Sequence, residues 1–287
     1  MEPRAVLDGI LERSTERRTP CGEGDMVWRV WGAGGPDKKT VVLLHGGSGS
    51  WNHWVRTIPA LEDDFRLIVA DLPGCGSSDS APEPFDAASL AGIVSDGLFD
   101  LIPAGETYDM VCFSFGGVIS GLVAQAQAER MQSLTIVGTP ILGLIKGGKA
   151  NDLRAVPADA TPEEAAPLYR HNLEKLMVHD PAVIDDLAMT LHMENMANVR
   201  LRSRGIARRH PVAHDLDGLD CALSFIFGEH DPTLHPSLEG IRAHVATQHP
   251  DARFEIVPGA GHWVPYEAPD MFNSCLRKCL SRSVSGD

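Results

Sequence analysis

Short apolar stretches alternate with longer amphipathic stretches along most of this 287-residue chain. Short apolar runs are typical of buried strands, and the patterns between them have the spacing of helices. Strands are predicted over 26–31, 40–44, 65–70, 108–113, 133–138, 221–227 and 252–257, the first with the alternation of an edge strand. Helices are predicted over 3–13, 86–101, 116–130, 237–247 and 268–281. This order predicts an α/β fold, a parallel sheet with helices on both faces.

Residues 141–215 break the alternation and contain no clear strand pattern. They predict helices over 162–178, 181–197 and 199–209, with prolines at first-turn positions of the first two, where proline is tolerated. We therefore interpret 141–215 as an inserted helical lid. Residues 1–140 and 216–287 would then form the core domain.

The chain around Ser114 has the pattern of a strand followed directly by a helix. An apolar run ends at Phe113, and Gly116 and Gly117 follow the serine. A serine on such a sharp turn exposes its hydroxyl above the sheet, and the next backbone N–H, that of Phe115, points to where an oxyanion would form. We predict Ser114 as a nucleophile rather than a simple turn residue. Cys112 stands where the usual Gly-x-Ser-x-Gly pattern has its first glycine.

Three further turns follow predicted strands and carry partners for such a serine. The glycine-rich turn 45–49 offers the backbone N–H of Gly47 as a second oxyanion donor. Asp231 follows the strand 221–227, and His262 follows the strand 252–257. The carboxyl ends of parallel strands share one edge of a sheet, so we predict Asp231 as the acid and His262 as the base. Glu229 and then Asp220 are the rival carboxylates.

These motifs, in the chain order Ser, Asp, His, resemble the α/β-hydrolase family, in particular serine hydrolases with a helical lid, over roughly residues 25–282. The glycine-rich run 70–79 resembles a loop of the same family. The resemblance implies an eight-stranded, mostly parallel sheet, with the lid inserted near Thr139. The pair His262–Trp263 and the turn at His45 also resemble hydrolases of aromatic meta-cleavage products. Those enzymes usually have Asn before the nucleophile, where this chain has Phe113.

The composition limits the kinds of molecule that this chain is expected to bind. A net charge of −14 disfavours nucleic acid and anionic membranes, so a small-molecule substrate is expected. No apolar run approaches the roughly 20 residues of a membrane span, and the six scattered cysteines suit reduced thiols in the cytoplasm. His230, Asp231 and His235 lack the accompanying ligand spacing of a metal site, so neither metal nor cofactor is predicted. The sequence leaves open whether the chain forms a homo-oligomer.

The predicted function is hydrolysis of a small carboxylic ester through an acyl-enzyme. The alternatives are carbon–carbon bond hydrolysis of the meta-cleavage type, a lactonase or thioesterase, and a non-catalytic ligand-binding member of the fold. Trp263 and Arg200 are the candidate substrate-binding residues. Arg200, Arg204 and Arg208 would share one helical face, either as a solvated surface or with one arginine binding a substrate carboxylate.

Overall fold

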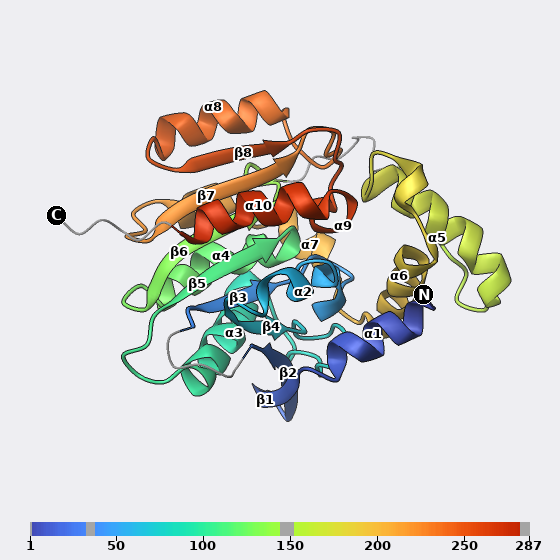
Figure 1. The fold of residues 1–287 in the computed structure, drawn as a ribbon, viewed down its shortest axis with the longest axis horizontal. Coiled ribbons are helices and arrows are strands. Elements are labelled where there is room, and N and C mark those ends of the chain that lie inside the picture. Colours follow the sequence, from blue (N-terminus) through green and yellow to red (C-terminus); the bar gives the residue numbers. More distant parts are fainter. Residues whose placement is uncertain (1, 33–37, 144–151, 282–287) are drawn as a thin grey trace.

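A computed structural model describes residues 2–32, 38–143 and 152–281 of the chain. Its centre is one eight-stranded sheet with the order β1-β2-β4-β3-β5-β6-β7-β8 (Figure 1). The strands are β1 (Thr15–Cys21), β2 (Gly24–Trp31), β3 (Thr40–Leu44), β4 (Arg66–Ala70), β5 (Tyr108–Phe113), β6 (Met131–Val137), β7 (Ala222–Gly228) and β8 (Arg253–Val257). Strand β2 pairs antiparallel with both β1 and β4, and every other pair is parallel. The predicted α/β class and mostly parallel sheet are confirmed.

Helices cover both faces of the sheet because the central strands are apolar on both sides. In β3, Val42 and Leu44 face one core cluster, whereas Val41 and Leu43 face the other. The first cluster is covered by α3 (Ala87–Leu101), α4 (Phe115–Ala126) and α8 (Leu238–Gln248). The second is covered by α1 (Pro3–Leu11), α2 (Ile58–Leu61), α9 (Val264–Glu267) and α10 (Pro269–Leu280). None of the described helices combines the length and the apolar character needed to cross a membrane.

The edge of the sheet differs from the prediction. Strand β1 lies outside β2, so the segment 26–31 is not an edge strand as predicted. Strand β1 has only two buried residues, Thr19 and Cys21, and its exposed residues include the charged run Glu16-Arg17-Arg18. Strand β1 therefore lacks the apolar pattern from which the other strands were predicted. Strand β2, in contrast, is buried over most of its length.

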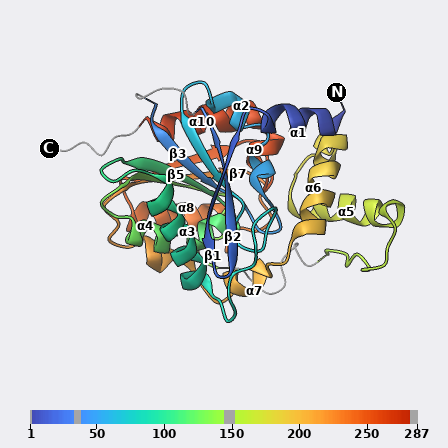
Figure 2. The same cartoon turned by 90° about the horizontal axis from the view of Figure 1, so that it is seen from below.

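The segment 141–215, which the structure describes over 141–143 and 152–215, lies between β6 and β7 and contains no strand within those ranges. It forms α5 (Pro162–Leu176), α6 (Asp186–Asn198) and α7 (Ser203–Ala207). Figures 1 and 2 show α5 and α6 at one side of the molecule, away from the sheet. We call 141–215 the inserted segment.

Two helices of the inserted segment differ from their predicted bounds. Helix α6 begins at Asp186, after the short turn Pro181–Val183, because Asp185 caps its first turn. The predicted helix 199–209 is reduced to Ser203–Ala207. The backbone N–H groups of Arg200 and Leu201 instead donate to Gly74 O, at 2.7 and 3.2 Å, which holds this stretch against the core. Arg200 therefore does not share a helical face with the arginines that follow it.

Candidate active site

Ser114 lies on the sharp turn between β5 and α4. Its φ of 50° and ψ of −109° are unusual for a residue with a side chain. Two bonds to the end of the neighbouring strand hold this conformation. The Ser114 N–H donates to Val137 O at 2.8 Å, and Thr139 Oγ1 donates to Ser114 O at 3.0 Å. The turn thus presents the serine hydroxyl above the carboxyl edge of the sheet, as predicted for a nucleophile.

Gly116 and Gly117 are required by close packing under the turn. A Cβ on Gly116 would lie 2.7 Å from Leu44 O and 2.8 Å from His45 O, and a Cβ on Gly117 would collide with the side chain of Thr139. The Gly116 N–H also donates to His45 O at 3.0 Å. The serine turn and the turn after β3 are therefore fixed to each other.

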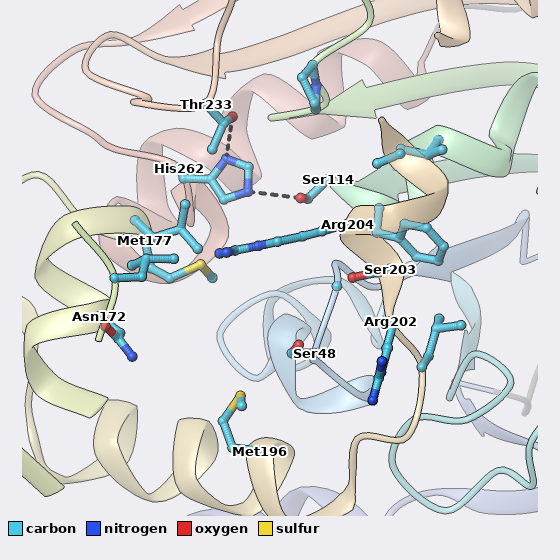
Figure 3. A pocket seen from close by; sticks show the side chains of 18 of the residues that line it. Ser48, Ser114, Asn172, Met177, Met196, Arg202, Ser203, Arg204, Thr233 and His262 are labelled. Atoms are coloured by element: carbon cyan, nitrogen blue, oxygen red, sulfur yellow. Dashed lines mark hydrogen bonds between the residues drawn. The ribbon is translucent and has the colours of Figure 1, made fainter. Parts of the chain in front are cut away.

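Ser114, His262 and Asp231 are brought together by the structure (Figure 3 shows the serine and the histidine). His262 Nε2 lies 2.9 Å from Ser114 Oγ, and His262 Nδ1 lies 2.8 Å from Asp231 Oδ2. Asp231 and His262 are both buried, so water does not compete for these bonds. The rival Glu229 is exposed and accepts from Gly259 N–H at 2.9 Å. Asp220 precedes β7, at the opposite end of that strand from Asp231.

Thr233 is a site residue that the sequence pattern did not bring to attention. Its N–H and its hydroxyl both donate to Asp231 Oδ1, at 2.8 and 2.7 Å, and its hydroxyl lies 3.3 Å from His262 Nδ1. These contacts leave Asp231 Oδ2 to face the imidazole. An aspartate that accepts from the backbone two residues on is a common turn, so the run Asp231-Pro232-Thr233 contained a signal for this contact.

The predicted oxyanion donors lie side by side. A Cβ on Gly47 would lie 3.6 Å from the Cβ of Phe115 and 2.5 Å from Ser203 Oγ. Phe115 is the first residue of α4, where a backbone N–H has no intrahelical acceptor. Gly47, Phe115 and Ser114 line the same cavity. The arrangement can therefore offer two backbone donors beside the serine hydroxyl.

The loop that carries His262 is packed against the end of α5. Gly261 N–H donates to Glu267 Oε2 at 2.6 Å, and the same carboxylate accepts from the N–H groups of His179 and Asp180. Trp263 N–H donates to Met177 O at 2.6 Å. The inserted segment thus supports the backbone on both sides of His262.

Trp263 lies behind the site rather than in it. Its side chain is 1% exposed, stacks on Tyr266 at 4.2 Å and donates from Nε1 to His53 O at 3.1 Å. It is not among the residues that line the cavity. The prediction that Trp263 contacts substrate is therefore not supported by its position, because His53, whose ring lies 5.2 Å from that of Trp263, lines the cavity whereas Trp263 does not.

The cavity above Ser114 has a volume of about 650 Å³ and is bounded by the core and by the inserted segment. Figure 3 shows Met177 and Met196 of the inserted segment across the cavity from Ser114. Apolar lining comes from both sides, from Phe113, Phe115, Val118 and Pro140 of the core and from Leu153, Leu176, Met177, Met196 and Leu201 of the inserted segment. The space suits a small, partly apolar molecule.

The charged lining of this cavity is entirely cationic among the described residues. Arg154, Arg202, Arg204 and Arg208 line it, whereas no described Asp or Glu does so. Burial, followed by the nearby charge of Arg208, lowers the pKa of Arg204. In a chain with a net charge of −14, such a cluster concentrates positive charge at this cavity.

Arg200 is not part of this cluster. Its guanidinium donates to Asn198 O at 3.0 Å and to Ser78 O, on the loop after β4. It is absent from the cavity lining. The prediction of Arg200 as a substrate-binding residue is corrected for a physical reason: the chain leaves helical geometry at residue 199 and turns this side chain toward the core. Arg204 has the position that was expected of Arg200.

Two neutral histidines also line the cavity. Burial, and then the neighbouring imidazole of His45, lowers the pKa of His53 well below its usual value. Burial lowers the pKa of His192, on α6, from 6.5 to about 4. Both imidazoles are therefore uncharged near neutral pH.

The depressed pKa of His192 makes stability depend on pH. Between about pH 6.5 and pH 4 the unfolded chain binds a proton at this residue that the folded chain does not bind, so the free energy of unfolding falls as the pH falls. We expect the free energy of unfolding of His192→Leu to depend less steeply on pH, by up to the slope that one bound proton contributes. Urea unfolding at pH 7, 6 and 5 measures it. An identical pH slope in both proteins would contradict the assignment.

Comparison with known proteins places these features in a wider context. Residues 41–274 match the sequence profile of the alpha/beta hydrolase family. The 2-hydroxy-6-oxononadienedioate/2-hydroxy-6-oxononatrienedioate hydrolase of Paraburkholderia phymatum is 27% identical over 295 residues, which span 94% of this chain and 97% of that protein. An esterase from Rhodococcus sp. ECU1013 is similar in structure, with a TM-score of 0.76 and 25% identity over 94% of this chain and 99% of its own.

A second solved structure shares the fold. The 2-hydroxy-6-oxo-6-phenylhexa-2,4-dienoate hydrolase from Rhodococcus sp. strain RHA1 has a TM-score of 0.72 and 20% identity, over 94% of this chain and 99% of its own. The similarities therefore include hydrolases of two kinds, those that cleave esters and those named for dienoate substrates. Each of these three likenesses extends over most of the chain, so the similarity is not confined to the turn at Ser114.

Proposed function

Because the chain belongs to the alpha/beta hydrolase family and is a hydrolase, we propose that it cleaves a small carboxylic ester through a Ser114–His262–Asp231 triad. The observation that supports this proposal most strongly is the continuous pair of contacts, 2.9 Å from Ser114 Oγ to His262 Nε2 and 2.8 Å from His262 Nδ1 to Asp231 Oδ2. A nucleophile, a base and a group that orients the base are thereby in hydrogen-bonding contact.

In the proposed mechanism His262 Nε2 takes the proton of Ser114 as its Oγ attacks the substrate carbonyl. The N–H groups of Phe115 and Gly47 stabilise the tetrahedral oxyanion, an effect usually worth several kcal/mol. His262 then gives the proton to the leaving group, which departs and leaves an acyl-enzyme. Water activated by the same imidazole releases the acid, and Asp231 stabilises the imidazolium in both halves of the reaction.

The inserted segment is proposed to act as a lid that shapes the substrate site. Met177 and Met196 come from this segment and face Ser114 across the cavity (Figure 3). Leu173, Ile184 and Leu191 of the same segment join a core cluster of the main domain. The lid is thus packed on the core and closes one side of the cavity with apolar side chains.

Carbon–carbon bond hydrolysis is the second candidate. Two observations favour it: the likeness to the hydrolase of Paraburkholderia phymatum over nearly the whole chain, and a cavity lined by arginines. The residue before the nucleophile favours ester hydrolysis instead. It is Phe113, whose ring packs 5.0 Å from the ring of His262 and 5.5 Å from that of His53, and it has no hydrogen-bonding group to offer a dienolate substrate.

A panel of substrates tests these alternatives with the purified protein. It contains p-nitrophenyl acetate and butyrate, simple lactones, an acyl thioester and a 2-hydroxy-6-oxo-dienoate, each also incubated with the Ser114→Ala variant. Release of p-nitrophenol that depends on Ser114, with the dienoate untouched, supports the ester hydrolase. Turnover of the dienoate at a higher kcat/KM than any ester would support the second candidate. No turnover and no reaction with a fluorophosphonate would indicate a protein that only binds its ligand.

We expect substrates that carry a carboxylate to be preferred over neutral substrates of the same size. In Figure 3 the side chain of Arg204 reaches across the cavity between Ser114 and Met177. A hydrogen-bonded contact with a charged partner is worth about 1.5–3 kcal/mol, or roughly tenfold to a hundredfold in kcat/KM. The preference is measured with p-nitrophenyl hemisuccinate and p-nitrophenyl butyrate.

Substitution of the arginine separates this effect from the charge of the whole protein. Arg204→Met should abolish the preference for the hemisuccinate while the rate with the butyrate ester changes little. Arg209→Met is the matched control, because Arg209 follows α7 and does not line the cavity. If the two esters react at equal rates and Arg204→Met changes neither rate, this arginine has no role in substrate binding.

A further inference from the structure

The turn that carries Gly47 is strained. Ser48 has a φ of 51°, and among the described non-glycine residues only Ser114 shares a positive φ. Such a conformation is unfavourable for a residue with a side chain and persists only where the surrounding structure holds it. Ser48 directly follows Gly47 in the chain, so a change in its backbone would displace the turn that carries the Gly47 N–H. Whatever holds Ser48 in place therefore also aims the proposed oxyanion donor.

Part of the support for this turn comes from the core. His45 O accepts from Gly116 N–H at 3.0 Å, His45 Nε2 accepts from Leu72 N–H at 2.9 Å, and Trp51 N–H donates to Asp71 Oδ1 at 2.7 Å. These bonds fix the two ends of the stretch from residue 45 to residue 51. Between them, Gly46 N–H donates to His53 Nδ1 at 3.3 Å.

The inserted segment adds a contact at the far end of this stretch, through Asn195 of α6. Ser50 Oγ donates to Asn195 Oδ1 at 2.9 Å, and Asn195 Nδ2 donates to Asn52 Oδ1 at 2.8 Å. Ser50, Asn52 and Asn195 are 4%, 4% and 3% exposed. Bonds between polar groups so well shielded from water are strong, and loss of one partner leaves the others unsatisfied.

We infer that Asn195 is a positioning residue: through Ser50 and Asn52 it holds the strained turn at Ser48 so that the Gly47 N–H points at the oxyanion. This inference rests on the proposed serine-hydrolase function. It assigns to the lid a part in catalysis beyond enclosing the substrate, because helix α6 completes the support of one oxyanion donor.

Helix α6 does not depend on Asn195 for its attachment. Asp185, which caps the helix, pairs with Arg56 at 2.9 Å and accepts from the hydroxyl of Tyr266. Near its other end, Glu194 pairs with Arg4 of α1 at 2.8 Å. Leu191 is fully buried in the core cluster. Removal of the Asn195 amide should therefore loosen the turn and leave the helix docked.

The first test is Asn195→Ala with p-nitrophenyl acetate as the probe substrate. We expect kcat to fall about tenfold to a hundredfold, less than the 10²–10³-fold loss typical when an oxyanion donor is removed outright. KM should change less than about threefold, and the midpoint of the pH–rate profile should stay where it is in the wild type, because the base is untouched. Asn198→Ala is the matched control on the same helix, since its exposed amide donates to Glu194 O within that helix.

The second test asks whether the loss acts through Ser48. Glycine adopts a positive φ without strain. In a Ser48→Gly background, Asn195→Ala should therefore lower kcat by less than about threefold, compared with tenfold or more in the wild-type background. A purely structural role would give the same loss in both backgrounds. Equal losses, or no loss of kcat in Asn195→Ala, would overturn the inference.

The last test distinguishes this inference from the proposed function itself. The rate of phosphonylation by a fluorophosphonate depends on Ser114 and on the oxyanion donors. If the wild type is not labelled, the serine-hydrolase proposal fails and the inference fails with it. If the wild type is labelled and Asn195→Ala is labelled at the same rate, only the inference fails. Slower labelling of Asn195→Ala with an unchanged melting temperature supports the inference. If the alanine variant does not fold, Asn195→Asp, which keeps an acceptor for the Ser50 hydroxyl, takes its place in the same measurement.

Discussion

Ser114→Ala is expected to lower kcat by about three to six orders of magnitude and to leave the fold intact. The expectation follows from the 2.9 Å contact between Ser114 Oγ and His262 Nε2, because groups that act as one unit lose most of their effect when the nucleophile is removed. The hydroxyl makes no other hydrogen bond within the described residues, so its loss should cost little stability. The measurement is kcat with the best ester of the substrate panel, together with circular dichroism and a thermal melt.

The matched control is Ser120→Ala on the same helix. The hydroxyl of Ser120 donates to Gly117 O within α4 and does not line the cavity, so this variant should keep its activity and its reaction with a fluorophosphonate. Ser114→Ala should lose both. Retention of more than a tenth of the wild-type activity in Ser114→Ala would end the serine-hydrolase proposal.

The central part of the fold was predictable from the sequence because the sheet is covered on both faces. Such strands are continuous apolar runs, and those of β3 and β5 are fully buried along their length. The positions of Ser114, Asp231 and His262 followed from the same pattern, since each residue lies in the turn or loop that follows a strand of a parallel sheet. The exposed strand β1 was missed because its burial depends on only two side chains.

The lining of the cavity could not be predicted in the same way. Helix periodicity placed Arg200 with Arg204 and Arg208, but the bonds from the backbone of Arg200 and Leu201 to Gly74 O end that periodicity. These contacts join segments more than a hundred residues apart and leave no local signal. The link from Asn195 to Ser50 and Asn52 is equally non-local. Only the contact of Thr233 with Asp231, within one turn, was readable in the sequence.

Asp231→Asn is expected to lower kcat by about four orders of magnitude. Asp231 Oδ1 accepts both donors of Thr233, at 2.8 and 2.7 Å, whereas Oδ2 faces His262 Nδ1 at 2.8 Å. An asparagine must keep its carbonyl oxygen toward Thr233, because an amide NH₂ there would face two donors. Its NH₂ group would therefore point at His262 Nδ1 and make this nitrogen an acceptor.

That reversal explains why so small a change should be so damaging. With Nδ1 as the acceptor, the neutral imidazole carries its proton on Nε2, which then donates to Ser114 Oγ and can no longer take the serine proton. The measurement is kcat with the best ester of the panel. Glu229→Gln is the matched control, since Glu229 is exposed, accepts from Gly259 N–H and pairs with His230 rather than His262. Thr233→Val should restore little of the activity of Asp231→Asn, because the backbone N–H of residue 233 still donates to the asparagine oxygen and holds the amide in the same orientation. A severe loss in Glu229→Gln combined with a mild one in Asp231→Asn would show that Glu229, and not Asp231, orients the base.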